Sequence, residues 1–493
     1  MNAPANPTSA ARRPTPGVRD LTTGPIRRTL LTFALPTLGS NILQSLNGSI
    51  NAIWVGRFLG EQALAATSNA NLTMFLMFAL GFGFGMAATI LVGQRIGARD
   101  LDGARRAMGT GLGLFAVLSL IIAAGGWFAA PKLLHLLATP AGAYGYALSY
   151  LRVIFLALPP MLLGLFITTC LRGTGDSVTP LRLMILNVLL DAGLNPLLIR
   201  GFGPFPAMGI AGSAMATLIA NYVILIVGII YIYRKDLPIR LRGRELAYII
   251  PDRRLLNFVF VRGISMGLQM LIMSLSGLFM IGLVNREGVE VTAAYGVAQQ
   301  LWGYVQMPAM AIGAAVSAMA AQNIGAAKWD RVGQITRAGV TANLLLTGGV
   351  VALLLLFDRP AMALFLGGSS PAIPIARHIQ YIASWSFVLF GVTMVLFATV
   401  RANGATLGPL LILASGIAVG RVGLAWFLRP SLGQDMLWWA SPLSSGWTMV
   451  MAIFYYRYGN WRKKMIGPKP SLAELTEEAN ASGEPGGRLN PSG

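Results

Sequence analysis

Twelve long apolar stretches follow one another along this 493-residue chain, and they restrict its fold more than any other feature. Charged residues make up 11% of the sequence, whereas soluble globular proteins carry roughly a quarter. A helix that crosses the hydrocarbon core needs about 20 apolar residues, and it satisfies its own backbone groups there. The sequence therefore predicts an all-α polytopic membrane protein. The expected spans are residues 29–55, 66–92, 107–130, 148–169, 181–199, 209–233, 257–284, 292–321, 335–357, 379–399, 408–428 and 436–456.

The formal net charge of +20 is distributed unevenly between the predicted loops. With the N-terminus inside the cell, 29 of the 38 lysines and arginines fall in cytoplasmic loops and tails. Positive charge in short loops stays on the cytoplasmic side of a membrane. We therefore expect a multi-pass protein of the plasma (inner) membrane with both termini in the cytoplasm, in contact with the lipid bilayer and without a nucleic-acid partner.

The residues needed for metal or nucleophilic chemistry are scarce. The chain has one cysteine, Cys170, and two histidines, His135 and His378, both in predicted outer loops. A membrane enzyme would need such groups together at membrane depth. We expect no resident metal, no cofactor and no enzymatic activity. No signal peptide is recognisable, because the first apolar run is too long for one and follows a Pro-rich tail.

Two pairs of matching segments indicate an internal repeat. The run GQRIGA at 93–98 corresponds to AQNIGA at 321–326, 228 residues later. Similarly, LRGTG at 171–175 corresponds to VRANG at 400–404. Six spans per copy give parallel repeats around a central cleft. The predicted organisation is a disordered basic tail at 1–28, a six-helix bundle at 29–233, a basic cytoplasmic linker at 234–256, a second six-helix bundle at 257–458 and a disordered tail at 459–493.

Asp191 differs from the other 17 acids because it lies in the middle of a predicted span. Asn187 and Asn195 are four residues away on either side, so the three share one helix face. A charged carboxylate at this depth costs a few kcal/mol or more, so it needs a partner or a use. One reading is an ion-coupling group that exchanges a proton or coordinates Na⁺ with the neighbouring amide oxygens. The other is a structural Asp that holds spans together.

Further polar side chains follow other spans at helical spacing. Most of them lie in the first half, and each set has two readings, a substrate-lined cavity or amide hydrogen bonds between helices. The candidate cavity residues are Gln44, Asn47, Thr217, Asn221, Gln269 and Gln299, with Asn51 assigned to the ion-coupling group.

Several short motifs together resemble the multidrug and toxic compound extrusion (MATE) family, over about residues 25–460. The resemblance implies a twelve-helix antiporter that exports cationic, amphipathic small molecules against a proton or sodium gradient by alternating access. We expect a monomer. A flippase for a lipid-linked saccharide is the alternative within the same superfamily. The motifs are NAIWVGR at 51–57, GQRIGA at 93–98, LRGTGD at 171–176 followed by Pro180, NPLLI at 195–199, GSAMAT at 212–217, AAYG at 293–296 and QNIGA at 322–326.

Two departures from the family pattern affect the expected mechanism. Asn51 stands where the family commonly has an Asp, and the usual Asn-then-Asp order of span five is reversed as Asp191 and Asn195. One acid therefore remains in the N-terminal half, and we expect Asp191 alone to carry the coupling charge. No acid occurs in span seven, which favours proton coupling over sodium coupling.

Overall fold

The computed structural model describes residues 20–463 apart from 137, 138, 140, 202–205, 368, 369, 425, 426, 428, 429 and 431–434. Within this part of the chain the regular structure is helical. The first half contains α1 (Ile26–Leu59), α2 (Glu61–Gly97), α3 (Leu101–Leu136), α4 (Ala141–Gly173), α5 (Val178–Arg200), α6 (Ile210–Arg234) and the 3₁₀ helix η1 (Gly243–Ile249). The second contains α7 (Arg253–Val284), α8 (Val289–Gly325), α9 (Trp329–Leu356), α10 (Asp358–Leu366), α11 (Ala372–Ala383), α12 (Ser386–Ala402), α13 (Leu407–Ser415), the π-helix η2 (Gly416–Leu424), α16 (Met436–Tyr458) and η4 (Asn460–Lys463).

Seven of the described helices are long and apolar enough to cross a membrane. An eighth span results if α11 and α12 count as one, although they are bent by 40° relative to each other. With 34 and 23 residues, α1 and α16 also have the length of a span. The all-helical polytopic fold is thus confirmed, while the number of twelve spans stays a prediction.

Some predicted spans are interrupted in the structure. The stretch predicted at 408–428 begins as α13 and widens into η2 from Gly416 onwards. In η2, Arg421 donates to the Ser276 carbonyl oxygen of α7 over 3.3 Å and to Ser441 Oγ of α16 over 3.0 Å. A π-turn is rare and often marks a functional or strained position. Here it places a guanidinium group between two neighbouring helices, a contact that hydropathy does not predict.

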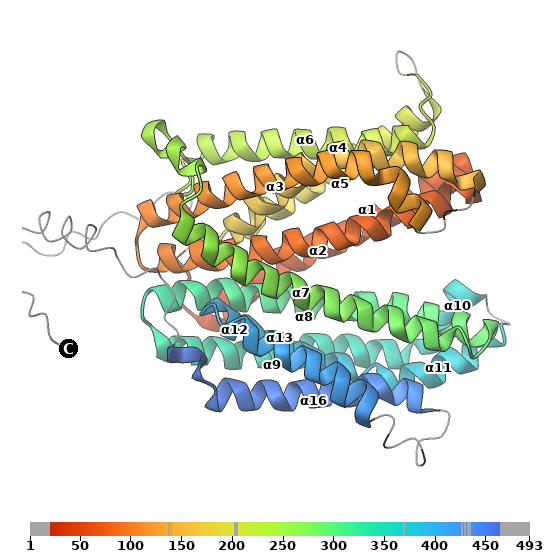
Figure 1. Ribbon diagram of the computed structural model, residues 1–493. Helices are drawn as coiled ribbons and strands as arrows, with labels where there is room; N and C mark the ends of the chain where they lie inside the picture. Colours follow the sequence, from red (N-terminus) through yellow and green to blue (C-terminus); the bar gives the residue numbers. More distant parts are fainter. Residues whose placement is uncertain are drawn as a thin grey trace, which may run out of the picture.

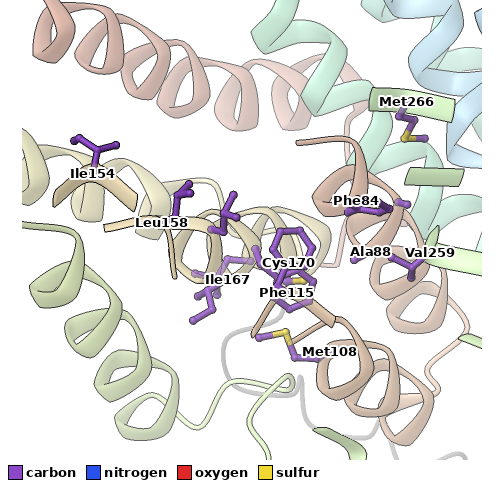
Figure 2. Close-up of a cluster of buried hydrophobic side chains, with 14 of the residues drawn as sticks. Phe84, Ala88, Met108, Phe115, Ile154, Leu158, Ile167, Cys170, Val259 and Met266 are labelled. Carbon is purple, nitrogen blue, oxygen red and sulfur yellow. The ribbon is translucent and has the colours of Figure 1, made fainter. Parts of the chain in front are cut away.

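The helices form two lobes (Figure 1), one built mainly from α1–α6 and the other mainly from α7–α16. A large apolar core in the first lobe joins α2, α3 and α4, and it includes Phe84, Phe115 and Cys170 (Figure 2). The second lobe has its own core, which includes Trp302 of α8 and Ala376 of α11.

The first helix of each half packs against the core of the other half. Val259 and Met266 of α7 belong to the core of the first lobe, close to Phe84 (Figure 2). Conversely, Leu30 and Phe33 of α1 belong to a cluster with α8 and α12. As a result, α7 runs obliquely from one lobe to the other (Figure 1).

The linker between the halves packs on the first lobe rather than extending away from it. Arg105 of α3 bonds Glu245 over 2.6 Å, and Tyr248 Oη donates to Asp102 over 2.8 Å. Leu237 and Ile239 belong to the core of this lobe, and Leu241 is buried as well. The linker therefore covers the surface of the first lobe beside α3.

One end of the molecule carries the linker, the α2–α3 and α8–α9 turns and η4 (at the left in Figure 1). We call it the basic end, because arginines and lysines gather there. Residues 20–25, which precede α1, also lie there against α8 and α9: Asn323 Nδ2 donates to the Leu21 carbonyl and Lys328 Nζ to the Thr22 carbonyl, each over 3.0 Å.

Candidate functional site

Asp191 is buried in the first lobe without a cationic partner. Its side chain lies on α5, between α1 and α6, and the residue is 1% exposed. Among the described acids, Asp358 is the other buried one, and Arg377 neutralises it over 2.6 Å. No Lys, Arg or His of the described chain forms an ion pair with Asp191. The structure thus holds a carboxyl group whose surroundings are polar but uncharged.

Three neutral side chains from three helices surround this carboxyl group. Asn51 Nδ2 of α1 donates to Asp191 Oδ2 over 2.9 Å, and Thr217 Oγ1 of α6 donates to Oδ1 over 3.1 Å. Asn195 Nδ2 reaches Asp191 Oδ1 over 3.3 Å and Asn51 Oδ1 over 2.6 Å. The four-residue spacing of Asp191 and Asn195 on α5 makes this possible, because it places both on one helix face.

The structure brings most of the predicted polar residues of the first half toward this group. Asn47 lies one turn before Asn51 on the same face of α1, and Asn221 donates to the Thr217 carbonyl over 2.8 Å. Asn187 lies one turn away on α5, and its Oδ1 is buried without a hydrogen-bond donor. Gln44 is exposed on α1 and takes no part in the described network.

The two predicted residues of the second half lie elsewhere. Gln269 is buried on α7 and donates to the Ser265 and Thr406 carbonyls over 3.2 Å each, so it joins α7 to the turn before α13. Gln299 on α8 donates to Tyr295 Oη over 3.3 Å. Both residues form hydrogen bonds to groups of the second half, Gln269 to backbone carbonyls and Gln299 to a side chain, and neither bonds Asp191.

Two oxygen atoms near Asp191 lack a hydrogen-bond donor. Asn47 Oδ1 and Asn195 Oδ1 are both buried and unpaired in the described structure. Buried polar atoms are nearly always paired, so each unpaired one calls for an explanation. Together with the Asp191 carboxylate they provide the oxygen ligands that a hard cation prefers. The carboxyl group can therefore hold a proton, and the unpaired amide oxygens are the atoms available as further ligands for a small cation.

Replacing Thr217 by valine removes one hydrogen bond to Asp191 while preserving the side-chain shape. The net value of such a bond is about 1 kcal/mol, or roughly fivefold in an equilibrium constant. We expect transport to fall by about that factor at unchanged expression, measured as the initial rate of dye efflux. Thr292→Val is the matched control, because Thr292 bonds only the Gly288 carbonyl on the exposed start of α8. Equal loss in both variants would contradict a role for Thr217 beside Asp191.

The repeated motifs meet at the basic end, which the sequence did not predict. Gln94 Nε2 of the first copy donates to the Ala402 carbonyl over 2.7 Å, and Gln322 Nε2 of the second donates to the Gly173 carbonyl over 3.0 Å. Each bond crosses from one lobe to the other, and the two are related by the repeat. The repeat itself was the available signal, because a contact between two repeats occurs a second time with the corresponding residues exchanged.

Two glycines allow this contact between the lobes. A Cβ atom on Gly97 would lie 1.9 Å from the Gln322 carbonyl oxygen, and one on Gly325 would lie 1.9 Å from the Gln94 carbonyl oxygen. The backbones of α2 and α8 thus touch at their last turns. In this conformation the lobes are closed against each other at the basic end.

Known proteins resemble this chain over nearly its whole length. It is 34% identical to the probable multidrug resistance protein YoeA of Bacillus subtilis (strain 168), over 89% of this chain and 95% of that protein. It is 28% identical to an FAD transporter of Shewanella oneidensis, over 70% and 75% of the two chains. Its fold matches the outward-facing conformation of a multidrug resistance MATE family transporter of the MOP superfamily, with a TM-score of 0.81, 22% identity, and 90% and 97% coverage.

The family comparison also agrees with the internal repeat. The family model MatE matches twice, over residues 36–197 and over residues 265–427, once in each half. The members of this family are transporters, which agrees with the buried polar site in a polytopic helical fold. The resemblance seen in the short motifs is confirmed: the chain belongs to the MatE family of multi-pass membrane transporters.

Proposed function

We propose that this protein is a proton-coupled antiporter that exports amphipathic, often cationic small molecules by alternating access. The observation that carries the proposal is the buried carboxyl group of Asp191, which has three neutral hydrogen-bonding neighbours and no ion-pair partner in the described structure. The multidrug resistance proteins among its relatives support the export of small molecules.

The exchange follows from the charge on this group. An uncompensated carboxylate at membrane depth costs a few kcal/mol or more. Asp191 therefore favours states in which it holds either a proton or a positively charged ligand nearby. Binding of a cationic substrate displaces the proton, and return of a proton releases the substrate. If the lobes open to opposite sides in these two states, proton entry drives substrate exit.

Sodium is a second candidate for the coupling ion, and one observation favours it. Asn47 Oδ1 and Asn195 Oδ1 are buried acceptors without donors, and Na⁺ would pair them with the Asp191 carboxylate. This arrangement uses only oxygens, as hard cations require. The absence of an acid in α7 favours the proton, so the two ions need a direct comparison.

Purified protein in liposomes separates the two ions. We expect an imposed pH gradient, acidic inside, to drive uptake of ethidium into these liposomes in sodium-free buffer. A sodium gradient at equal pH on both sides should give no uptake. The opposite pattern would assign the coupling to Na⁺, and no ethidium movement under either gradient would refute the proposed antiport of cationic compounds.

The orientation and assembly are part of the same proposal. We place the basic end in the cytoplasm, because short basic loops are retained there, and Arg95, Arg99, Lys328 and Arg331 all lie at this end. Both termini are then cytoplasmic, and the protein works as a monomer in the plasma (inner) membrane. Labelling of single cysteines in intact cells tests this orientation: Lys328→Cys should resist a membrane-impermeant reagent, and Glu287→Cys should react with it.

A further inference from the structure

A groove lies in the second lobe at its basic end, whereas Asp191 lies in the first lobe. It has a volume of about 1090 Å³ and runs between the start of α9 and the end of α16, with α12 behind it. One part of it is basic and the other is apolar. Its lining includes the arginines Arg337, Arg457 and Arg462 and the apolar side chains Val340, Leu396 and Ile453.

The arginines of this groove are not neutralised by the described protein. None of the three takes part in an ion pair among the described residues. The Arg462 guanidinium lies over the ring of Trp461, 5.3 Å from its centroid, which holds it at the groove edge. Asp330 is the one acid of the lining. Three positive charges against one negative charge give the groove a net positive character that attracts anions.

The internal repeat shows what the corresponding surface of the first lobe holds. Adding the repeat offset to Gly109 and Gly113 of α3 gives Arg337 and Thr341 of α9, both in the groove lining. In the first lobe this surface is covered by the interlobe linker. A Cβ on Gly109 would lie 2.6 Å from the Cβ of Tyr248, and one on Gly113 would lie 2.0 Å from the Ile249 carbonyl oxygen. Because glycine has no side chain, these two positions of α3 allow the linker to pack closely on the helix.

The second lobe cannot accept a peptide in the same way. Arg337 and Thr341 replace the two glycines with side chains that occupy the position of the linker backbone. In the first lobe the arginines of this surface, Arg105 and Arg106, pair with the acids Glu245 and Asp102. The groove has thus lost the glycines that admit a polypeptide segment, and its arginines have no ion-pair partner among the described residues.

We propose that this groove binds an anionic phospholipid. The phosphate group would lie among Arg337, Arg457 and Arg462, and an acyl chain would follow the apolar wall formed by Val340 and Ile453. Arginine binds phosphate through strong charge-assisted hydrogen bonds, and basic pockets between membrane helices bind anionic headgroups. The combination of three arginines with an apolar wall fits a lipid better than it fits a free phosphate ion, because a phosphate ion makes no apolar contacts.

Lipid binding to the purified full-length protein tests this proposal. Native mass spectrometry would compare phosphatidylglycerol with phosphatidylcholine, each added to delipidated protein, with inorganic phosphate in a third sample. We expect retained phosphatidylglycerol on the unmodified protein and at least about tenfold weaker retention in the variant R337Q/R457Q/R462Q. The matched control is R244Q/R253Q/R254Q, which removes three exposed arginines from and beside the linker and should bind like the unmodified protein.

Each other outcome contradicts the proposal. Equal retention of phosphatidylcholine would show that the headgroup charge is not recognised. Displacement of the lipid by millimolar phosphate would indicate a phosphate site without a lipid preference. If E474Q/E477Q/E478Q strengthened lipid binding, the acidic C-terminal tail would be the occupant instead. If the triple arginine variant aggregates, the single variant Arg337→Gln is measured instead, because Arg337 is exposed. Unchanged retention of phosphatidylglycerol by this variant would refute the site.

Discussion

Replacing Asp191 by asparagine should abolish coupled transport while leaving the protein folded. Asparagine has the shape of aspartate and keeps an oxygen that accepts from Asn51 or Thr217, so the contact between α1, α5 and α6 persists. What is lost is the carboxyl group that, in the proposed mechanism, alternates between its neutral and its charged form. We expect ethidium efflux from energised cells to fall to the level of cells without the transporter, and proton movement in liposomes to stop.

The control for this change is Glu290→Gln, which removes an acid from the exposed start of α8. It should leave efflux unchanged. The thermal midpoint of the purified Asp191→Asn protein should stay within a few degrees of the unmodified protein, because the substitution avoids burying a charge. If the Asp191→Asn variant retained efflux, Asp191 would not be the coupling residue.

Replacing Gly97 or Gly325 by valine should prevent the lobes from closing at the basic end. Each new Cβ would lie 1.9 Å from a carbonyl oxygen of the opposite lobe, and backbone atoms at this contact cannot move aside as a flexible side chain can. Overpacking of this kind costs typically about 1–3 kcal/mol. The closed conformation should therefore lose about five- to 150-fold in population relative to conformations in which the basic end is open.

The distance between the lobes measures this shift. Cys170 is buried and is the one cysteine of the chain, so spin labels can be placed in a Cys170→Ser background at Lys235 on the first lobe and Arg457 on the second. Both valine variants should show a longer distance and reduced transport. Gly164→Val is the control, because a Cβ there meets no atom within 4 Å. An unchanged distance in Gly97→Val would mean that this contact does not set the conformation.

The local parts of the structure could be predicted from the sequence, because they depend on spacing along one helix. Apolar runs of span length predicted most of the helices. The four-residue spacing of Asp191 and Asn195 predicted a shared face, and Asn51 was placed beside them. The structure shows that all three are connected by hydrogen bonds.

Contacts between helices far apart in the chain could not be predicted in this way. Hydropathy identifies which residues avoid water, but most of the surface of a membrane helix is apolar whether it faces lipid or protein, so hydropathy does not reveal which helix packs on which. This is why Gln269 was expected in the cavity and instead joins α7 to the turn at Thr406. The packing of Gln94 and Gln322 across the lobes was missed for the same reason.

Because α1 and α7 each pack on the core of the other half, they limit how the two lobes can move relative to each other. Gly83 of α2 has the backbones of Gly263 and Gly267 so close that an added Cβ would lie within 2.5 Å of them. The seam lies beside the stacked rings of Phe84 and Phe260, so backbone contact and aromatic packing together hold α2 against α7. The contact between α2 and α7 therefore constrains any motion in which the basic end opens, because the two backbones have no room to come closer at this point.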